Sequence, residues 1–158
     1  MINVERLGKH INKFTFRNGN VSFDMEFRGH LTVLEGDSST GKTYFFNSVA
    51  QSYPNNVNAF KSHGIDGVVY VNAINTVSDG DFDSLLRTLK SRKGCLVLID
   101  NGDKVLNGRD ALLKYISVDS DNQYVICSRG GVSLGLAPNC YGELKQNGAE
   151  IATTYYWN

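Results

Sequence analysis

The chain has 158 residues, with 16 Lys and Arg balanced by 16 Asp and Glu, and 41% of its residues are hydrophobic. This length is typical of one globular domain, the apolar content argues against disorder, and the balanced charge gives no general reason to expect nucleic acid as a partner. Residues 1–14 lack the apolar stretch of a signal peptide, and no window approaches the roughly 18 apolar residues of a membrane span. We therefore expect a cytoplasmic protein in which Cys95 and Cys127 are reduced core residues.

Apolar and polar residues alternate over 11–16 and 21–27 around an Asn18-Gly19 turn signal, which predicts a β-hairpin. Further strands are predicted at 31–35, 68–72, 95–99 and 123–127. Helices are predicted at 42–51, from a cap within 78–83 to the break at 93–94, and at 110–118. Segment 53–67, rich in Pro, Asn, Ser and Gly, is predicted to be a loop. The order of strands and helices predicts a mainly parallel sheet, with a second hairpin at 140–145 and 150–157.

The strongest motif is GDSSTGKT, which follows an apolar strand and begins a predicted helix. Glycines let successive backbone N–H groups point at phosphate oxygens, and the helix adds the positive end of its dipole. In such a loop Lys42 would bridge the β- and γ-phosphates, and the Thr43 hydroxyl would bind Mg²⁺. The predicted nucleotide-binding residues are Gly36, Asp37, Ser38, Ser39, Thr40, Gly41, Lys42, Thr43 and Tyr44.

A second motif, CLVLID, is an apolar strand that ends in Asp100. Ligands of open α/β sheets bind at the carboxyl edge, so Asp100 is predicted to reach the Mg²⁺ beside Thr43. The alternative is that the strand ends in Asp merely because the chain turns there.

With these two motifs, the chain resembles the P-loop ATPases, most closely a minimal core of the ABC and AAA type. The resemblance implies a three-layer α/β sandwich with antiparallel hairpins at both ends of the chain. It also implies that Phe16, upstream of Lys42, packs against adenine, although an aromatic residue in a hairpin is more often part of the core.

The chain departs from that family in several places. Asn101 follows Asp100 where the family has a catalytic glutamate, and an amide can position water but cannot take its proton. Ser128 and Arg129 stand where the ABC group has a switch histidine; they are candidates for a γ-phosphate contact and a charge clamp, respectively. Asp103 and Glu35 are alternative bases or plain surface carboxylates. The ABC signature LSGGQ is absent.

The expected function is therefore binding of ATP with Mg²⁺, with slow or partner-dependent hydrolysis that controls an interaction with a protein partner or a second copy. Two alternatives stay open: a small-molecule phosphotransferase and a structural module that keeps its nucleotide without hydrolysing it.

Overall fold

The computed structural model describes residues 2–35, 42–128, 136 and 140–155. The elements run in chain order as β1 (Ile2–Leu7), β2 (His10–Asn18), β3 (Val21–Glu26), β4 (Leu31–Glu35), α1 (Lys42–Ser52), the 3₁₀ turn η2 (Tyr53–Asn55), α2 (Val57–Ser62), β5 (Gly67–Val71), α3 (Asp79–Ser91), β6 (Cys95–Ile99), α4 (Gly102–Val105), α5 (Asp110–Val118), β7 (Gln123–Ser128), β8 (Cys140–Asn147) and β9 (Glu150–Tyr155). None of these helices is long and apolar enough to cross a membrane.

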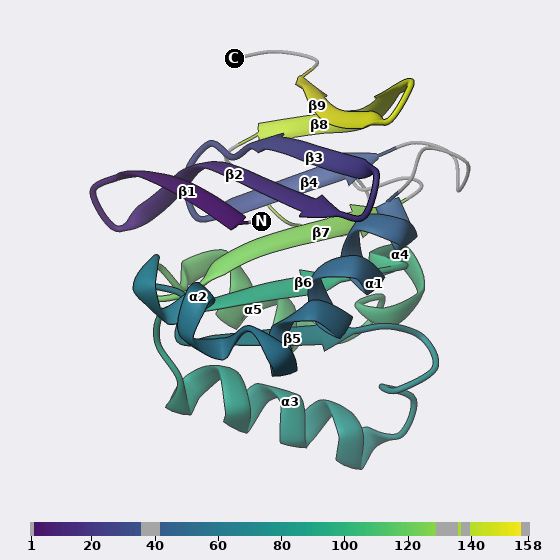
Figure 1. Cartoon of the computed structure of the whole chain (residues 1–158). Coiled ribbons are helices and arrows are strands. Elements are labelled where there is room, and N and C mark those ends of the chain that lie inside the picture. The colour runs from purple at the N-terminus through teal and green to yellow at the C-terminus, as the bar shows by residue number, and fades with distance from the viewer. Residues whose placement is uncertain (1, 36–41, 129–135, 137–139, 156–158) are drawn as a thin grey trace.

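The strands form one mixed sheet in the order β1-β2-β3-β9-β8-β4-β7-β6-β5 (Figure 1). Strands β8, β4, β7, β6 and β5 are mutually parallel, and antiparallel pairs join β1 to β2, β2 to β3 and β8 to β9. The expected α/β class, with a largely parallel centre and hairpins from both ends of the chain, is confirmed. Every residue of β6 is buried, because parallel strands flank it on both sides.

Helices cover both faces of the parallel strands, and each face has its own apolar core. Helices α1 and α2 pack on one face with the aromatic residues of β2 and β3, whereas α3, α4 and α5 pack on the other. The connection through α1 runs from β4 toward β5, and those through α3 and α5 run back from β5 toward β7. Because crossovers are right-handed, these opposite directions place the helices on opposite faces.

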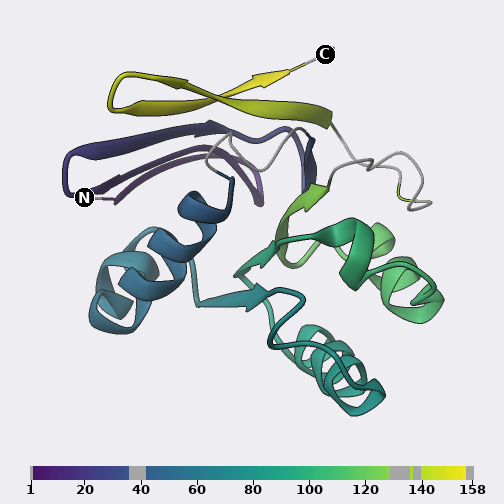
Figure 2. The ribbon, with the colours of Figure 1, turned by 90° about the vertical axis from the view of Figure 1, so that its right-hand side faces the viewer.

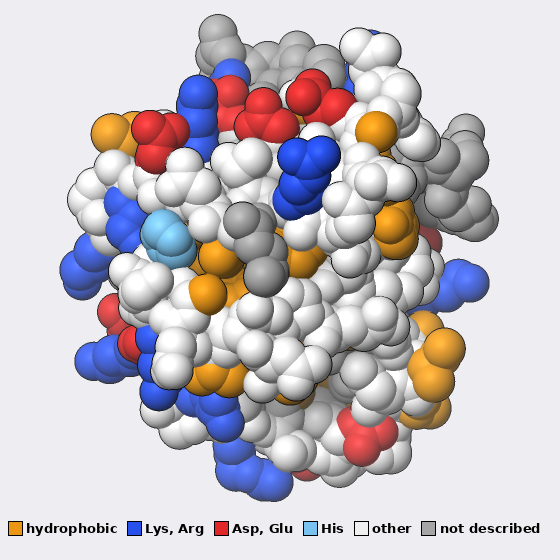
Figure 3. All heavy atoms as spheres, in the orientation of Figure 1, with side chains coloured by type: hydrophobic (Ala, Val, Ile, Leu, Met, Phe, Trp, Pro, Cys, Tyr) orange, Lys and Arg blue, Asp and Glu red, His pale blue; other side chains and the backbone are white. Residues whose placement is uncertain are grey.

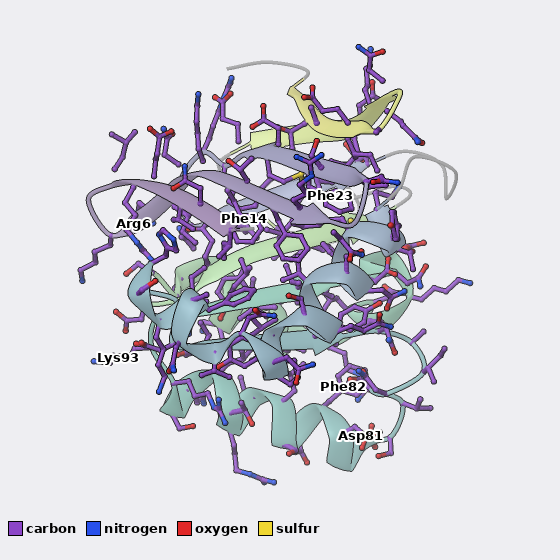
Figure 4. The ribbon with its side chains drawn as sticks, in the orientation of Figure 1. Arg6, Phe14, Phe23, Asp81, Phe82 and Lys93 are labelled. Atoms are coloured by element: carbon purple, nitrogen blue, oxygen red, sulfur yellow. The ribbon has the colours of Figure 1, made fainter. Side chains whose placement is uncertain are left out.

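The sheet curls, so that β2 and β3 fold over α1 instead of continuing the plane of β5, β6 and β7 (Figure 2). Phe14 and Phe23, labelled in Figure 4, lie on these two strands and both make edge-to-face contacts with Phe45 of α1, at 6.0 and 5.2 Å between centroids. All three rings are fully buried. The N-terminal hairpin is therefore a wall of the core around α1.

Three segments differ from the sequence expectation. The prediction of a loop at 53–67 is wrong, since η2 and α2 lie there and Phe60 of α2 is fully buried against the ring of Tyr53. Its polar residues suggested a loop, but one buried aromatic residue is enough to hold a single short helix against the core. Strand β1 and helix α4 were not predicted from the sequence, because β1 is mostly exposed and α4 has only four residues.

Candidate functional site at the carboxyl edge of the sheet

Four parallel strands end at one edge of the sheet and bring the predicted site residues together. Glu35 at the end of β4 pairs in register with Ser128 at the end of β7. Asp100 directly follows β6, and its backbone N–H donates to the carbonyl of Val71, the last residue of β5, at 2.8 Å. Ser128 and Asp100 are 2% and 5% exposed. The edge thus places small polar side chains at the ends of buried apolar strands.

A side-chain hydrogen bond joins the two sequence motifs. The Thr43 hydroxyl, in the first turn of α1, donates to Oδ2 of Asp100 at 2.8 Å, across 57 residues of chain. The other carboxylate oxygen, Oδ1, accepts from the backbone N–H of Asn101 at 2.9 Å. This second bond fixes the rotation of the carboxylate and keeps Oδ2 directed at Thr43.

The hydroxyl and the carboxylate are oxygen ligands of the kind that Mg²⁺ prefers. Thr43 and Asp100 are therefore the residues that fit a magnesium ion. Within the described residues no group of three or more His, Cys, Asp and Glu side chains is placed to hold a metal. An ion at this edge would thus take its other ligands from phosphate oxygens and water, which is how Mg²⁺ is usually bound beside nucleotides.

Lys42 is the first residue of α1 and is only 6% exposed. Its charge lies near Cys127, the buried residue before Ser128. Burial raises the pKa of the Cys127 thiol well above its usual value, and the carboxylate of Asp100 raises it further, whereas Lys42 opposes the shift. One buried thiol therefore experiences both charges, which places the ammonium of Lys42 and the carboxylate of Asp100 at the same end of β7.

Described residues that follow the neighbouring strands β4 and β7 pack on opposite faces of the sheet. The next described element after β4 is α1, which belongs to the core formed with β2 and β3. After β7, the described residue Leu136 is buried in the core on the other face. Connections that diverge in this way define a topological switch point, where open α/β sheets bind their ligands.

Asn101 is the one described residue other than glycine with a positive φ, at φ 53° and ψ 46°. Left-handed backbone is costly for most side chains but is tolerated by Asn. The residue directly follows Asp100 and precedes α4, and its side chain is exposed and makes no capping hydrogen bond. The left-handed residue therefore lies at the carboxyl end of β6, between Asp100 and α4.

Phe16 lies in the core. It is 1% exposed, and its ring packs against those of Phe14 and Phe23 at centroid distances of 6.4 and 6.3 Å. The alternative that was open for this residue, a core position in the hairpin, is where the structure places it, because β2 turns the side chain inward toward α1.

Several predicted site residues lie outside the described residues: Gly36, Asp37, Ser38, Ser39, Thr40, Gly41 and Arg129. Of the alternative bases, Glu35 ends β4 and Asp103 lies in α4, and both are partly exposed. Tyr70 and Asn72 were not predicted as part of this edge. Burial chiefly raises the pKa of Tyr70, the Asp100 carboxylate adds to the shift, and a hydrogen bond with Asn72 opposes it. The sequence signal for Asn72 was its place as the last, polar residue of the buried strand predicted at 68–72.

A cavity of about 400 Å³ lies at the opposite, amino edge, where Arg6 and Lys93 are labelled in Figure 4. Lys and Arg side chains gather along this side of the molecule, on the left of Figure 3. The guanidinium of Arg6 is engaged by the carbonyls of His63, Gly64 and Lys9. Since its charged group ties β1 to the end of α2, this cavity is braced by structural contacts and lies away from Thr43 and Asp100.

Comparison with known protein families finds no model that matches the chain, and comparison with curated proteins finds no match. The function is therefore inferred from the residues and geometry of the carboxyl edge.

Proposed function

We propose that the chain is a P-loop protein that binds a nucleoside triphosphate with Mg²⁺ at the carboxyl edge and acts as a nucleotide-controlled module. The observation that carries this proposal is the 2.8 Å hydrogen bond between the Thr43 hydroxyl and Asp100. A GKT segment at the start of a helix and a carboxylate at the end of a buried strand are each common alone, and their direct contact supports a magnesium site that the two share.

In this proposal Lys42 contacts the β- and γ-phosphates, Thr43 ligates the ion, and Asp100 holds the ion or the water bound to it. Mg²⁺ neutralises charge on the phosphates when it is bound. The finer description of the fold, a three-layer P-loop sandwich, belongs to the same proposal. It is supported by the helices on both faces and by the switch point between β4 and β7.

Hydrolysis is proposed to be slow in the isolated chain. Asn101 stands next to Asp100, and its amide can orient a water molecule but cannot accept a proton at neutral pH. A protein partner or a second copy that adds a carboxylate or an arginine would then accelerate turnover. ATP is the proposed nucleotide, since the chain has no N/T-K-x-D guanine motif downstream of Lys42.

The test is a calorimetric titration of the purified chain with non-hydrolysable ATP and GTP analogues, each with and without Mg²⁺. We expect magnesium-dependent binding of the ATP analogue, and loss of that binding in Lys42→Ala. Thermal unfolding of the variant without ligand controls for its folding, because Lys42 is buried. An unchanged affinity in a folded Lys42→Ala variant would overturn the proposal, as would failure of the parent chain to bind either analogue.

A further inference from the structure

We infer that the ring of Tyr44 is the surface on which the base of the bound nucleotide stacks. This inference rests on the proposed function, because it needs phosphates bound at the start of α1. It assigns the base to Tyr44, which follows Lys42 in the chain, and not to Phe16, which precedes Lys42 and was the sequence expectation.

Tyr44 occupies the first turn of α1, directly after the Thr43 that bonds Asp100. It lies two residues after Lys42, a rise of about 3 Å along the axis. Side chains of a helix lean toward its N-terminus, so the Tyr44 side chain leans toward the start of α1. The proposed function puts phosphates at Lys42 and Thr43 there, and a base joined to them through its ribose would lie beside the first turn, within reach of this ring.

Exposure separates Tyr44 from its neighbours. It is 44% exposed, whereas Phe45 and Phe46, which follow it directly, are fully buried. The helix already directs two aromatic rings into the core, and the third is nearly half exposed and so contributes less to that core. Large exposed aromatic rings of this kind are more typical of binding surfaces than of scaffold positions.

The ring is nevertheless held in one place. It meets Phe23 of β3 edge-to-face, with centroids 5.6 Å apart and planes at 61°. Phe23 is itself fully buried and packs on Phe16 at 6.3 Å and on Phe45 at 5.2 Å. One side of Tyr44 therefore rests on the aromatic core around α1. Because its side chain is already held there, stacking of a ligand on the ring costs little side-chain entropy.

The other aromatic residues described near this edge are less suited. Phe16 is 1% exposed, and the partly buried Tyr70 makes an edge-to-face contact with Phe46 at 6.1 Å. A stacked base presents only its π-face to Tyr44, and every base has one. The platform therefore supplies affinity for a nucleotide over bare phosphates, with weak discrimination between adenine and guanine.

The experiment compares two ligands in three proteins: the parent chain, Tyr44→Phe and Tyr44→Leu. Each is titrated by calorimetry with a non-hydrolysable ATP analogue and with tripolyphosphate, both with Mg²⁺. Tyr44→Leu is expected to weaken binding of the analogue about 5- to 150-fold, the range that loss of one base stack produces. Tripolyphosphate should bind all three proteins alike, and this also shows that the variants are folded. Tyr44→Phe keeps the ring and should stay close to the parent.

The other outcomes separate the two proposals. An unchanged affinity of Tyr44→Leu for the analogue, or an equal loss for both ligands, overturns the assignment of Tyr44 and leaves the phosphate site standing. Equal affinities of the parent chain for the analogue and for tripolyphosphate do the same. Failure of the parent chain to bind either ligand overturns the proposed function itself.

Discussion

The two edges of the parallel sheet use polar residues in different ways. At the amino edge, side chains are bonded to one another and to the backbone: the buried Asp119 accepts from the Tyr124 hydroxyl at 2.6 Å and from the Asn122 amide at 2.8 Å. Gln123 likewise bonds Ile11 and Gly29, which ties β7 to β2. At the carboxyl edge, Thr43 and Asp100 join the ends of two elements, and Asn101 adopts a left-handed backbone beside them.

This difference indicates a division of roles between the edges. A buried polar group is stable only when it is paired, so the bonded network of the amino edge contributes to the folded state. Unusual backbone and short polar residues at strand ends are common where a site is formed. We therefore expect substitutions at the amino edge to change stability and substitutions at the carboxyl edge to change ligand binding.

The largest effect is expected for Asp119→Ala. The substitution leaves the hydroxyl of Tyr124 and the amide of Asn122 buried without their acceptor, at about 1–3 kcal/mol each, so we expect a loss of about 3 kcal/mol in the free energy of unfolding. Urea denaturation measures this loss, and nucleotide affinity should not change. Asp121→Ala, an exposed carboxylate two residues away, is the control and should stay within about 0.5 kcal/mol of the parent. Similar losses in both variants would contradict a structural role for the buried network.

Thr43→Val is expected to reduce the magnesium dependence of nucleotide affinity about 10- to 100-fold, since it removes one hydroxyl while it keeps the shape of the side chain. Calorimetry with the ATP analogue over a range of Mg²⁺ concentrations measures the effect. Ser48→Ala, on the same helix, removes a hydroxyl that bonds Asn18 and should leave the magnesium dependence intact. If Thr43→Val keeps the full response to Mg²⁺, the carboxyl edge does not use Thr43 as a ligand.

Asn101→Glu combines a gain and a cost. A carboxylate next to Asp100 supplies a group able to take a proton from water, so hydrolysis measured by phosphate release should rise. The left-handed backbone at φ 53° should cost the variant about 1 kcal/mol of stability, because a longer side chain tolerates it less well than Asn. Asn101→Gly tolerates the backbone without adding a base, and it should show no gain in turnover. The absence of any gain in Asn101→Glu would argue that the base position lies elsewhere.

The smallest effect concerns pH at the amino edge. Burial lowers the pKa of His30, and the nearby His10 lowers it further, while Asp119 and backbone groups of Ser117 and Ile116 oppose the shift. The unfolded chain then binds a proton more readily than the folded one, so stability should fall as pH drops below about 6.5, the usual His value. Thermal unfolding of His30→Gln between pH 5 and about pH 7.5 should show a shallower dependence on pH than the parent. Parallel curves for the two proteins would exclude His30 as a source of the slope.

Much of the local structure was readable from sequence because it has local causes. The Asn18-Gly19 pair predicted the first hairpin, and Gly19 has the positive φ of 60° that its turn requires. Ser78 was within the segment expected to cap the second long helix, and it forms a capping box with Asp81 at the start of α3. The segment 53–67 was misread because its composition is that of a loop, while Phe60 is buried against the core and packs on Tyr53 of η2.

By itself, the sequence determined the strands and the three longest helices of the parallel centre, α1, α3 and α5, and the two motifs, since periodicity, turn residues and glycine spacing act over a few residues. Tertiary structure alone decided which groups meet. The direct bond between Thr43 and Asp100 depends on strands that are distant in the chain ending at the same edge. The curl of the sheet around α1 buries Phe16 and leaves Tyr44 exposed, because side-chain burial depends on which surfaces pack together and not on the residue type.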